Sequence, residues 1–101
     1  MPRNNKTSES LFQFMNLLIA LLQKNGQYRT SLHYRATLNS FKRYRDNKDI
    51  ALSEIDAEVM HSYEAYLHHT AKVCRTTSSF YLRILRATYN KAVAKGLTPQ
   101  Q

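Results

Sequence analysis

The chain has 101 residues and a mass of 11.8 kDa, with 43% apolar residues and only two glycines and two prolines. This length fits one domain with a modest core, and the apolar fraction is that of a globular chain, which argues against disorder. The longest apolar run, 17–22, is far shorter than the roughly 20 residues of a membrane-spanning helix. The single cysteine excludes an internal disulfide. We therefore expect one soluble, cytoplasmic domain over 1–101 with no membrane contact.

Basic and acidic residues are segregated along the chain, which carries a formal net charge of +8. Residues 29–45 hold five basic residues and no acid, 46–70 hold six acids and one lysine, and 71–101 hold six basic residues and no acid. Two acid-free blocks favour contact with a polyanion on one side of the domain, with the acidic block left to water or to a partner.

The apolar pattern has a helical period along nearly the whole chain and shows no strand alternation. A first helix is predicted to begin near Ser8 and to end at Asn25-Gly26, because serine caps helix starts and glycine closes helix ends. A second helix is predicted over 30–45. It is followed by a polar loop, 46–49, and by an extended stretch, 50–52, that packs on the core.

Two further helices are predicted in the second half of the chain. One covers 57–69 and is capped by Asp56, and the other covers 75–95 and is stopped by Gly96. The ends, 1–7 and 98–101, are expected to be flexible. The sequence thus predicts an all-α domain of four helices with short links.

Helical projection at 100° per residue separates two faces on the second and fourth predicted helices. On the fourth, one arc of roughly 100° is entirely polar: Arg75, Thr76, Ser79, Arg83, Arg86 and Asn90. On the second, the face opposite Tyr34, Leu38 and Phe41 holds a similar set: Arg29, His33, Ala36, Thr37, Ser40, Arg43 and Tyr44. Because Ala36 and Ser40 are small, another surface can approach this helix closely there.

These two faces are the candidate binding site. An ordinary exposed helix mixes glutamate with lysine and so gains pairs four residues apart. Here arginine predominates, Ser, Thr and Asn are interleaved, and no acid interrupts either face, a composition suited to phosphate and base-edge contacts. The candidate DNA contacts are Arg29, His33, Thr37, Ser40, Arg43, Arg75, Thr76, Ser79, Arg83, Arg86 and Asn90.

Catalytic and metal-binding patterns are not found in the sequence. His61, His68, His69 and Cys74 do not have the spacing of metal ligands. Two glycines are too few for a phosphate-binding loop, and the seven tyrosines mostly fall on apolar stripes. We expect no enzyme activity, no cofactor and no metal.

Residues 77–93, TSSFYLRILRATYNKAV, followed by Gly96-Leu97, resemble the last helix of the core-binding domain of phage-integrase-type tyrosine recombinases. Earlier matches, in the same order, are Thr30-x3-Tyr34-x3-Leu38-x2-Phe41, Leu52-x2-Ile55, Tyr63-x2-Tyr66-Leu67 and the opening helix over 12–22. The pattern is closest to integrases of mobile elements of the Bacteroides type. The chain departs from it at 71–74, where the family usually has a glycine turn and a serine cap, and at Thr76, where asparagine is common.

The resemblance implies a four-helix, SAM-like orthogonal bundle whose second and fourth helices lie against the major groove of duplex DNA at a recombination core site. In such recombinases a separate C-terminal domain carries the catalytic arginine, lysine and histidine residues and the tyrosine nucleophile. The resemblance therefore implies a fragment, inert and monomeric alone, that meets other recombinase protomers on DNA during integration and recombination.

Two alternatives of other classes remain at this point. One is a small helical DNA-binding regulator of the helix-turn-helix type. The 46–55 connection between the second and third predicted helices is too long for the short turn of that motif. The other is a helical protein-interaction module with an acidic partner, which would bind duplex DNA no better than any other polyanion.

Overall fold

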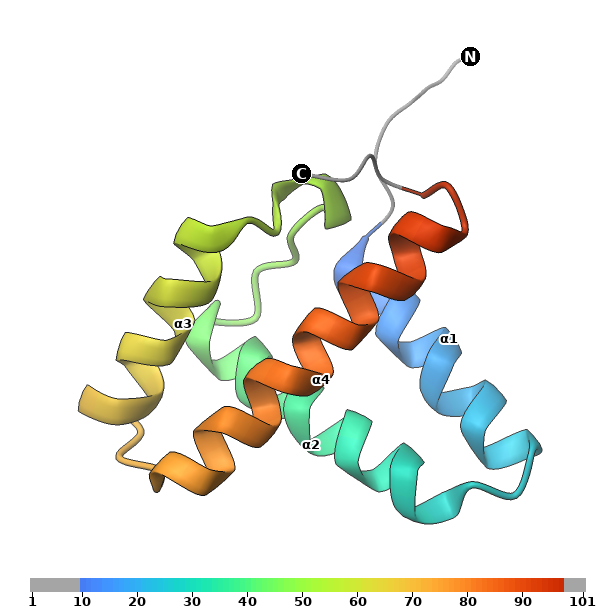
Figure 1. The fold of residues 1–101 in the computed structure, drawn as a ribbon, viewed down its shortest axis with the longest axis horizontal. Helices are drawn as coiled ribbons and strands as arrows, with labels where there is room; N and C mark the ends of the chain where they lie inside the picture. The colour runs from blue at the N-terminus through green and yellow to red at the C-terminus, as the bar shows by residue number, and fades with distance from the viewer. Residues whose placement is uncertain (1–9, 98–101) are drawn as a thin grey trace.

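Residues 10–97, the part of the chain that the computed structural model describes, form four α-helices and one short 3-10 turn (Figure 1). In chain order these elements are α1 (Leu11–Lys24), α2 (Tyr28–Tyr44), η1 (Leu52–Glu54), α3 (Ala57–His69) and α4 (Arg75–Ala94). Within this range no strand forms, and the only bridge is an isolated one between Ser10 and Ala51. The expected all-α fold of four helices is confirmed, while the ends expected to be flexible, 1–7 and 98–101, lie outside the described residues.

The start of α1 is capped by Ser10, not by Ser8 as the sequence suggested. The Ser10 hydroxyl accepts a hydrogen bond from a first-turn amide and donates one to the Asp49 carboxylate. The other Asp49 oxygen accepts hydrogen bonds from the amides of Phe12, at 3.2 Å, and Ile50, at 2.7 Å. Asp49 therefore ties the loop after α2 to the first turn of α1.

Most other helix ends lie close to their predicted positions. Gly26, at φ +79°, closes α1, and Gly96, at φ +74°, follows the end of α4. Asp56 caps α3 as expected, its carboxylate accepting from the Val59 amide at 2.9 Å. The 50–52 stretch differs in part: Ile50 and Leu52 are buried as predicted, but Leu52 begins η1 and does not continue the extended stretch.

The link between α3 and α4 replaces the glycine turn and serine cap that are usual in the recombinase pattern. Lys72 adopts φ +56°, a left-handed conformation that glycine takes at lower cost. Cys74 occupies the N-cap position of α4 and makes no capping hydrogen bond with its side chain. The turn therefore forms with less suitable residue types at both positions.

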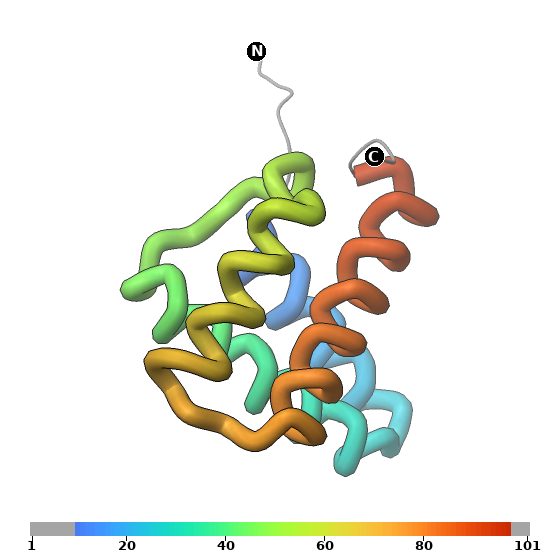
Figure 2. Tube along the Cα trace, turned by 60° about the vertical axis from the view of Figure 1, so that its left-hand side comes forward, coloured from blue at the N-terminus to red at the C-terminus, as the bar shows by residue number. Residues whose placement is uncertain are grey.

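Helix α2 lies at the centre of the domain. It packs most extensively against α1, and α4 crosses over it (Figure 1). Figure 2 shows α3 and α4 diverging from their short link, so that each approaches α2 at a different point. The core lies where the elements meet, and its fully buried side chains include Met15, Phe41, Leu52, Tyr63 and Leu85.

Replacing Asp49 tests how the loop holds α1. Asp49→Ala removes the acceptor of two backbone amides and of the Ser10 hydroxyl, so we expect a loss of about 1–2 kcal/mol in the free energy of unfolding, as for a helix cap. Urea denaturation followed by circular dichroism measures it. Lys48→Ala, an exposed change in the same loop, is the control; equal stability of both variants would contradict the account.

Candidate nucleic-acid interface

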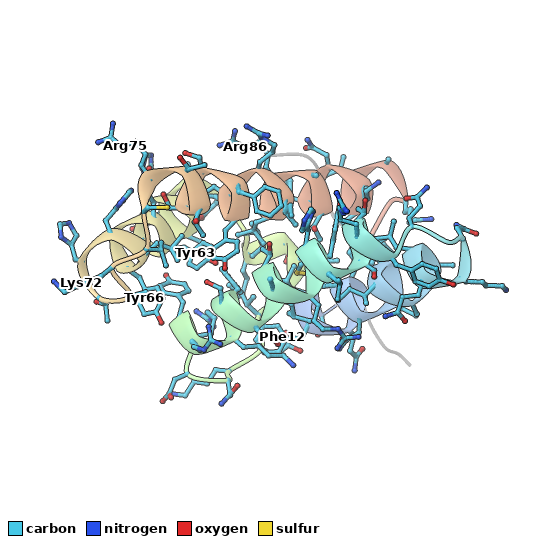
Figure 3. All side chains as sticks on the ribbon, turned by 90° about the horizontal axis from the view of Figure 1, so that it is seen from below. Phe12, Tyr63, Tyr66, Lys72, Arg75 and Arg86 are labelled. Atoms are coloured by element: carbon cyan, nitrogen blue, oxygen red, sulfur yellow. The ribbon has the colours of Figure 1, made fainter. Side chains whose placement is uncertain are left out.

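The polar arc of α4 is open to solvent along its length. All six predicted residues on it are exposed: Arg75, Thr76, Ser79, Arg83, Arg86 and Asn90. Figure 3 shows the side chains of Arg75 and Arg86 projecting from one side of α4, while Tyr63 and Tyr66 lie on the other. The projection from the sequence therefore placed this face correctly. Its contact with DNA stays a prediction.

The arc runs over about 22 Å of helix from Arg75 to Asn90, at 1.5 Å per residue. Within residues 10–97, no arginine or lysine lies within 4.0 Å of a carboxylate. The arginines of α4 are thus not engaged in ion pairs with the described acids, and their charge is available to a bound anion.

The corresponding face of α2 is not open, and the prediction that Thr37 and Ser40 lie on an exposed stripe is wrong. Thr37 is 0% exposed, and its hydroxyl donates to the carbonyl of His33 at 2.9 Å. Ser40 is 5% exposed, and its hydroxyl shares a 2.7 Å hydrogen bond with that of Tyr63 on α3. Neither side chain is accessible to DNA in this structure.

The physical reason is that α2 is covered on two sides. Tyr34, Leu38 and Phe41 are buried as the sequence predicted, and the opposite flank is covered as well, by α3 and α4. Ser40 does allow another surface to approach closely, as its small size suggested, but that surface is the ring of Tyr63. The sequence alone assigned a polar flank to solvent, whereas the fold uses it for packing.

His33 lies between the buried flank and the open rim of α2. It is half-buried, and its ring meets Phe80 of α4 edge-on at 4.8 Å between centroids. This contact joins the two helices beside the candidate site. By helical geometry Thr76 and Arg83 fall on the Phe80 side of α4, the side that adjoins α2.

Three further residues of the predicted α2 face form its open rim, whereas Tyr44 is half-buried and its hydroxyl donates to that of Ser62 at 2.7 Å. Arg29, Ala36 and Arg43 are exposed, and because they recur every seven residues they lie in one row along the helix. The row adjoins His33 on the α4 side. The structure therefore brings an α2 row with two arginines beside the α4 arc, whereas Thr37 and Ser40 lie beneath it.

Arg35 and Asn39 are exposed residues of α2 that the helical projection left out. They lie on the far side of the row from α4. The acid-free character of 29–45 was the available signal for Arg35. Lys42, in the same block, is partly buried, and its ammonium sits 5.5 Å from the centre of the Phe12 ring, so it packs on α1.

Tyr63 of α3 is fully buried beside the candidate site. It packs edge-on against Phe41 at 5.0 Å. Burial raises the pKa of the Tyr63 phenol far above its ordinary value, although the hydrogen bond with Ser40 acts in the opposite direction. The phenol is neutral at physiological pH and holds α3 onto α2.

Cys74 differs from Tyr63 in being exposed. Hydrogen bonding by Thr77, whose hydroxyl lies 3.2 Å from the Cys74 sulfur, lowers the pKa of this thiol. Among residues 10–97, no three His, Cys, Asp or Glu side chains cluster closely enough to hold a metal ion. No helix in the same range is long and apolar enough to cross a membrane.

The fold and the candidate site together define a four-helix bundle that presents one basic, acid-free helix face. Residues 10–101 match the phage integrase SAM-like domain family. The chain belongs to this family, whose domain is non-catalytic, and the SAM-like fold expected from the resemblance is confirmed. No curated protein and no solved structure shows a significant match to the chain.

Two serine-to-alanine substitutions test whether Ser40 is buried and Ser79 is exposed. Ser40→Ala leaves the buried Tyr63 hydroxyl without its partner, so we expect a loss of about 1–3 kcal/mol in the free energy of unfolding. Ser79→Ala, on the exposed arc of α4, removes the same hydroxyl from a solvent-facing position and should change stability little. Chemical denaturation of both variants makes the comparison, and a Ser79 effect as large as that of Ser40 would contradict the assignment.

Proposed function

We propose that this chain is the core-binding domain of a tyrosine recombinase and that it holds duplex DNA at a recombination core site. The observation that supports this proposal is the polar arc of α4. Its exposed side chains are arginines and residues with a hydroxyl or amide group, and no acid interrupts them. Membership of the integrase family supports the same assignment. The match of residues 77–93 favours an integrase of a Bacteroides-type mobile element.

In this proposal the two helices have distinct tasks. Arg83 and Thr76, on the side of α4 that adjoins α2, reach into the major groove together with the α2 row of Arg29, Ala36 and Arg43. Ala36 is small and lets the DNA backbone come close to the helix. Arg75 and Arg86, on the far side of the arc, contact flanking phosphates.

The catalytic chemistry belongs to another domain of the recombinase. The family domain supplies binding and orientation, and the breakage and joining of DNA strands are done elsewhere in the enzyme. Other recombinase protomers are the partners on the same DNA, and the integration and recombination of DNA is the process served. An acidic protein partner is the alternative, and it predicts no preference for duplex DNA over other polyanions.

Affinity for duplex DNA should depend steeply on salt. Each neutralised phosphate contributes about −0.9 to the slope of log K against log salt. If about four to six phosphates are contacted, affinity falls by roughly 10²–10³ between about 50 and 200 mM salt. Fluorescence anisotropy titrations across that range measure the slope, and an affinity that ignores salt would exclude the proposed mode.

Substitutions on the arc should weaken DNA binding without unfolding the domain. Arg83→Ala and Arg86→Ala are each expected to reduce binding by about 1–3 kcal/mol, because each removes a phosphate or base contact. Both side chains are exposed, so melting temperatures should stay near that of the wild type. Lys48→Ala, in the loop between Asp46 and Asp49, removes the same charge away from the arc and should leave affinity unchanged.

Arg83→Lys separates the two kinds of contact. A phosphate contact largely survives this change, whereas bidentate recognition of guanine does not. Equal DNA affinity of the wild type and a folded Arg83, Arg86 double alanine variant would defeat the proposal.

A further inference from the structure

The exposed face of α2 differs in chemistry from the arc of α4. On the arc, the exposed side chains are arginines, hydroxyls and one amide, which suit phosphate oxygens. On α2, Leu32 is 61% exposed within the acid-free block 29–45. A single exposed leucine says little about function. Its meaning here depends on the residues that share its side of the helix.

Leu32, Ala36, Asn39 and Arg43 form one strip along α2, which we call the α2 strip. Their spacings of four, three and four residues keep them within an arc of roughly 60° at 100° per residue. All four are exposed. Among residues 10–97, the Asn39 amide makes no hydrogen bond, so both its carbonyl oxygen and its NH₂ group are available to a ligand.

The α2 strip carries side chains that recognise base edges in the major groove. An asparagine amide forms two hydrogen bonds with adenine, donating to N7 and accepting from the N6 amino group. An apolar side chain packs on the 5-methyl group of thymine, which lies in the same groove. A phosphate offers neither an apolar surface nor a hydrogen-bond donor, so a backbone contact would use Leu32 not at all and Asn39 only in part.

We infer that the α2 strip reads a short sequence containing A·T pairs, with Asn39 bound to an adenine and Leu32 packed on a thymine methyl group. The inference rests on the proposed function, because it assigns base specificity to the same DNA-binding face. Leu32 and Asn39 are seven residues apart, about 10.5 Å along the helix. At about 3.4 Å per base pair, the two contacted pairs therefore lie within about three base pairs of each other. Ala36, between them, is small enough for the bases to approach the helix.

The α2 strip thereby adds sequence discrimination to the affinity that the α4 arc supplies. Contacts with phosphates bind all sequences alike and depend on salt, whereas contacts with base edges distinguish sequences. Replacing Leu32 or Asn39 removes no charge. Such variants should lose sequence preference while the slope of log K against log salt stays that of the wild type.

Replacement of single groups on the bases tests the inference. Selection from a random duplex library with the wild-type chain first gives its preferred duplex. Each adenine in turn is replaced by 7-deazaadenine, which lacks the N7 acceptor, and each thymine by uracil, which lacks the 5-methyl group. In anisotropy titrations, one 7-deazaadenine should weaken binding about tenfold, because a donor of Asn39 loses its partner. One uracil, within about three base pairs of it, should weaken binding about fourfold, as for one buried CH₂ group.

Alanine variants assign each effect to its residue. Asn39→Ala should abolish the sensitivity to 7-deazaadenine at that adenine, and Leu32→Ala should abolish the sensitivity to uracil at that thymine. Both positions are exposed and alanine is the best helix former, so circular dichroism should show folded proteins. Asn16→Ala and Leu17→Ala change the same residue types at exposed positions of α1, and these controls should keep both sensitivities.

The outcomes separate this inference from the proposed function. Wild-type binding that ignores every base replacement would overturn the inference and leave DNA binding by the domain standing. So would an Asn39→Ala or Leu32→Ala variant that keeps the full wild-type sensitivity to its base change. Wild-type affinity no higher for duplex than for heparin would refute the proposed function, and the inference with it.

Discussion

The arrangement of this domain depends on the burial of α2 on two sides. Its apolar stripe packs toward α1, and its polar flank is closed by the hydrogen bond between Ser40 and Tyr63 and by the edge-on contact of His33 with Phe80. A larger side chain at position 40 would push the Tyr63 ring, and α3 with it, away from α2. Because α4 lies over this same flank, the position of the basic arc relative to α2 is set by buried packing and not by the arc itself.

The residues that position the α4 arc are therefore different from the residues that carry its charge. Ser40 joins α2 to α3 through its hydrogen bond with Tyr63, and the buried Thr37 hydroxyl donates to His33 within α2. Arg83 and Arg86 sit on the outer side of α4, where substitution costs the core little. Acidic residues gather on α3 and in the loop before it, so the basic arc is left with no described carboxylate in pairing distance. Binding surface and scaffold are therefore distinct in chemistry as well as in place.

Helix type and order were predictable from the sequence because apolar periodicity and glycine positions act locally. Asp56 and Gly96 mark the ends of their helices through interactions within one turn. The exposed arc of α4 was predictable for the same reason, since only one side of that helix is covered. Ser10 as the cap of α1 was not, because its choice depends on Asp49, which is distant in the sequence.

The flank of α2 was not predictable because burial by α3 and α4 is a long-range property. Helical projection places polar residues opposite apolar ones, and it assumes that only one face is covered. The hydroxyls of Thr37 and Ser40 make hydrogen bonds inside the protein, with the His33 carbonyl and the Tyr63 hydroxyl. The polar character of these two residues therefore did not show whether they are exposed to solvent. Arg35 was omitted for a related reason, because it projects close to the stripe of Leu38 although its side chain remains exposed.

In the proposed complex, DNA lies on the α4 arc and the adjoining α2 row. Two-dimensional NMR of the labelled domain, titrated with a short duplex, locates the contact through the backbone amides and the arginine side-chain Nε–H groups. The largest shifts are expected at Arg83, Arg86 and the exposed row of α2, with small shifts on α3. The largest shifts on the acidic face of α3, or a spectrum unchanged at saturating duplex, would show that DNA does not lie there.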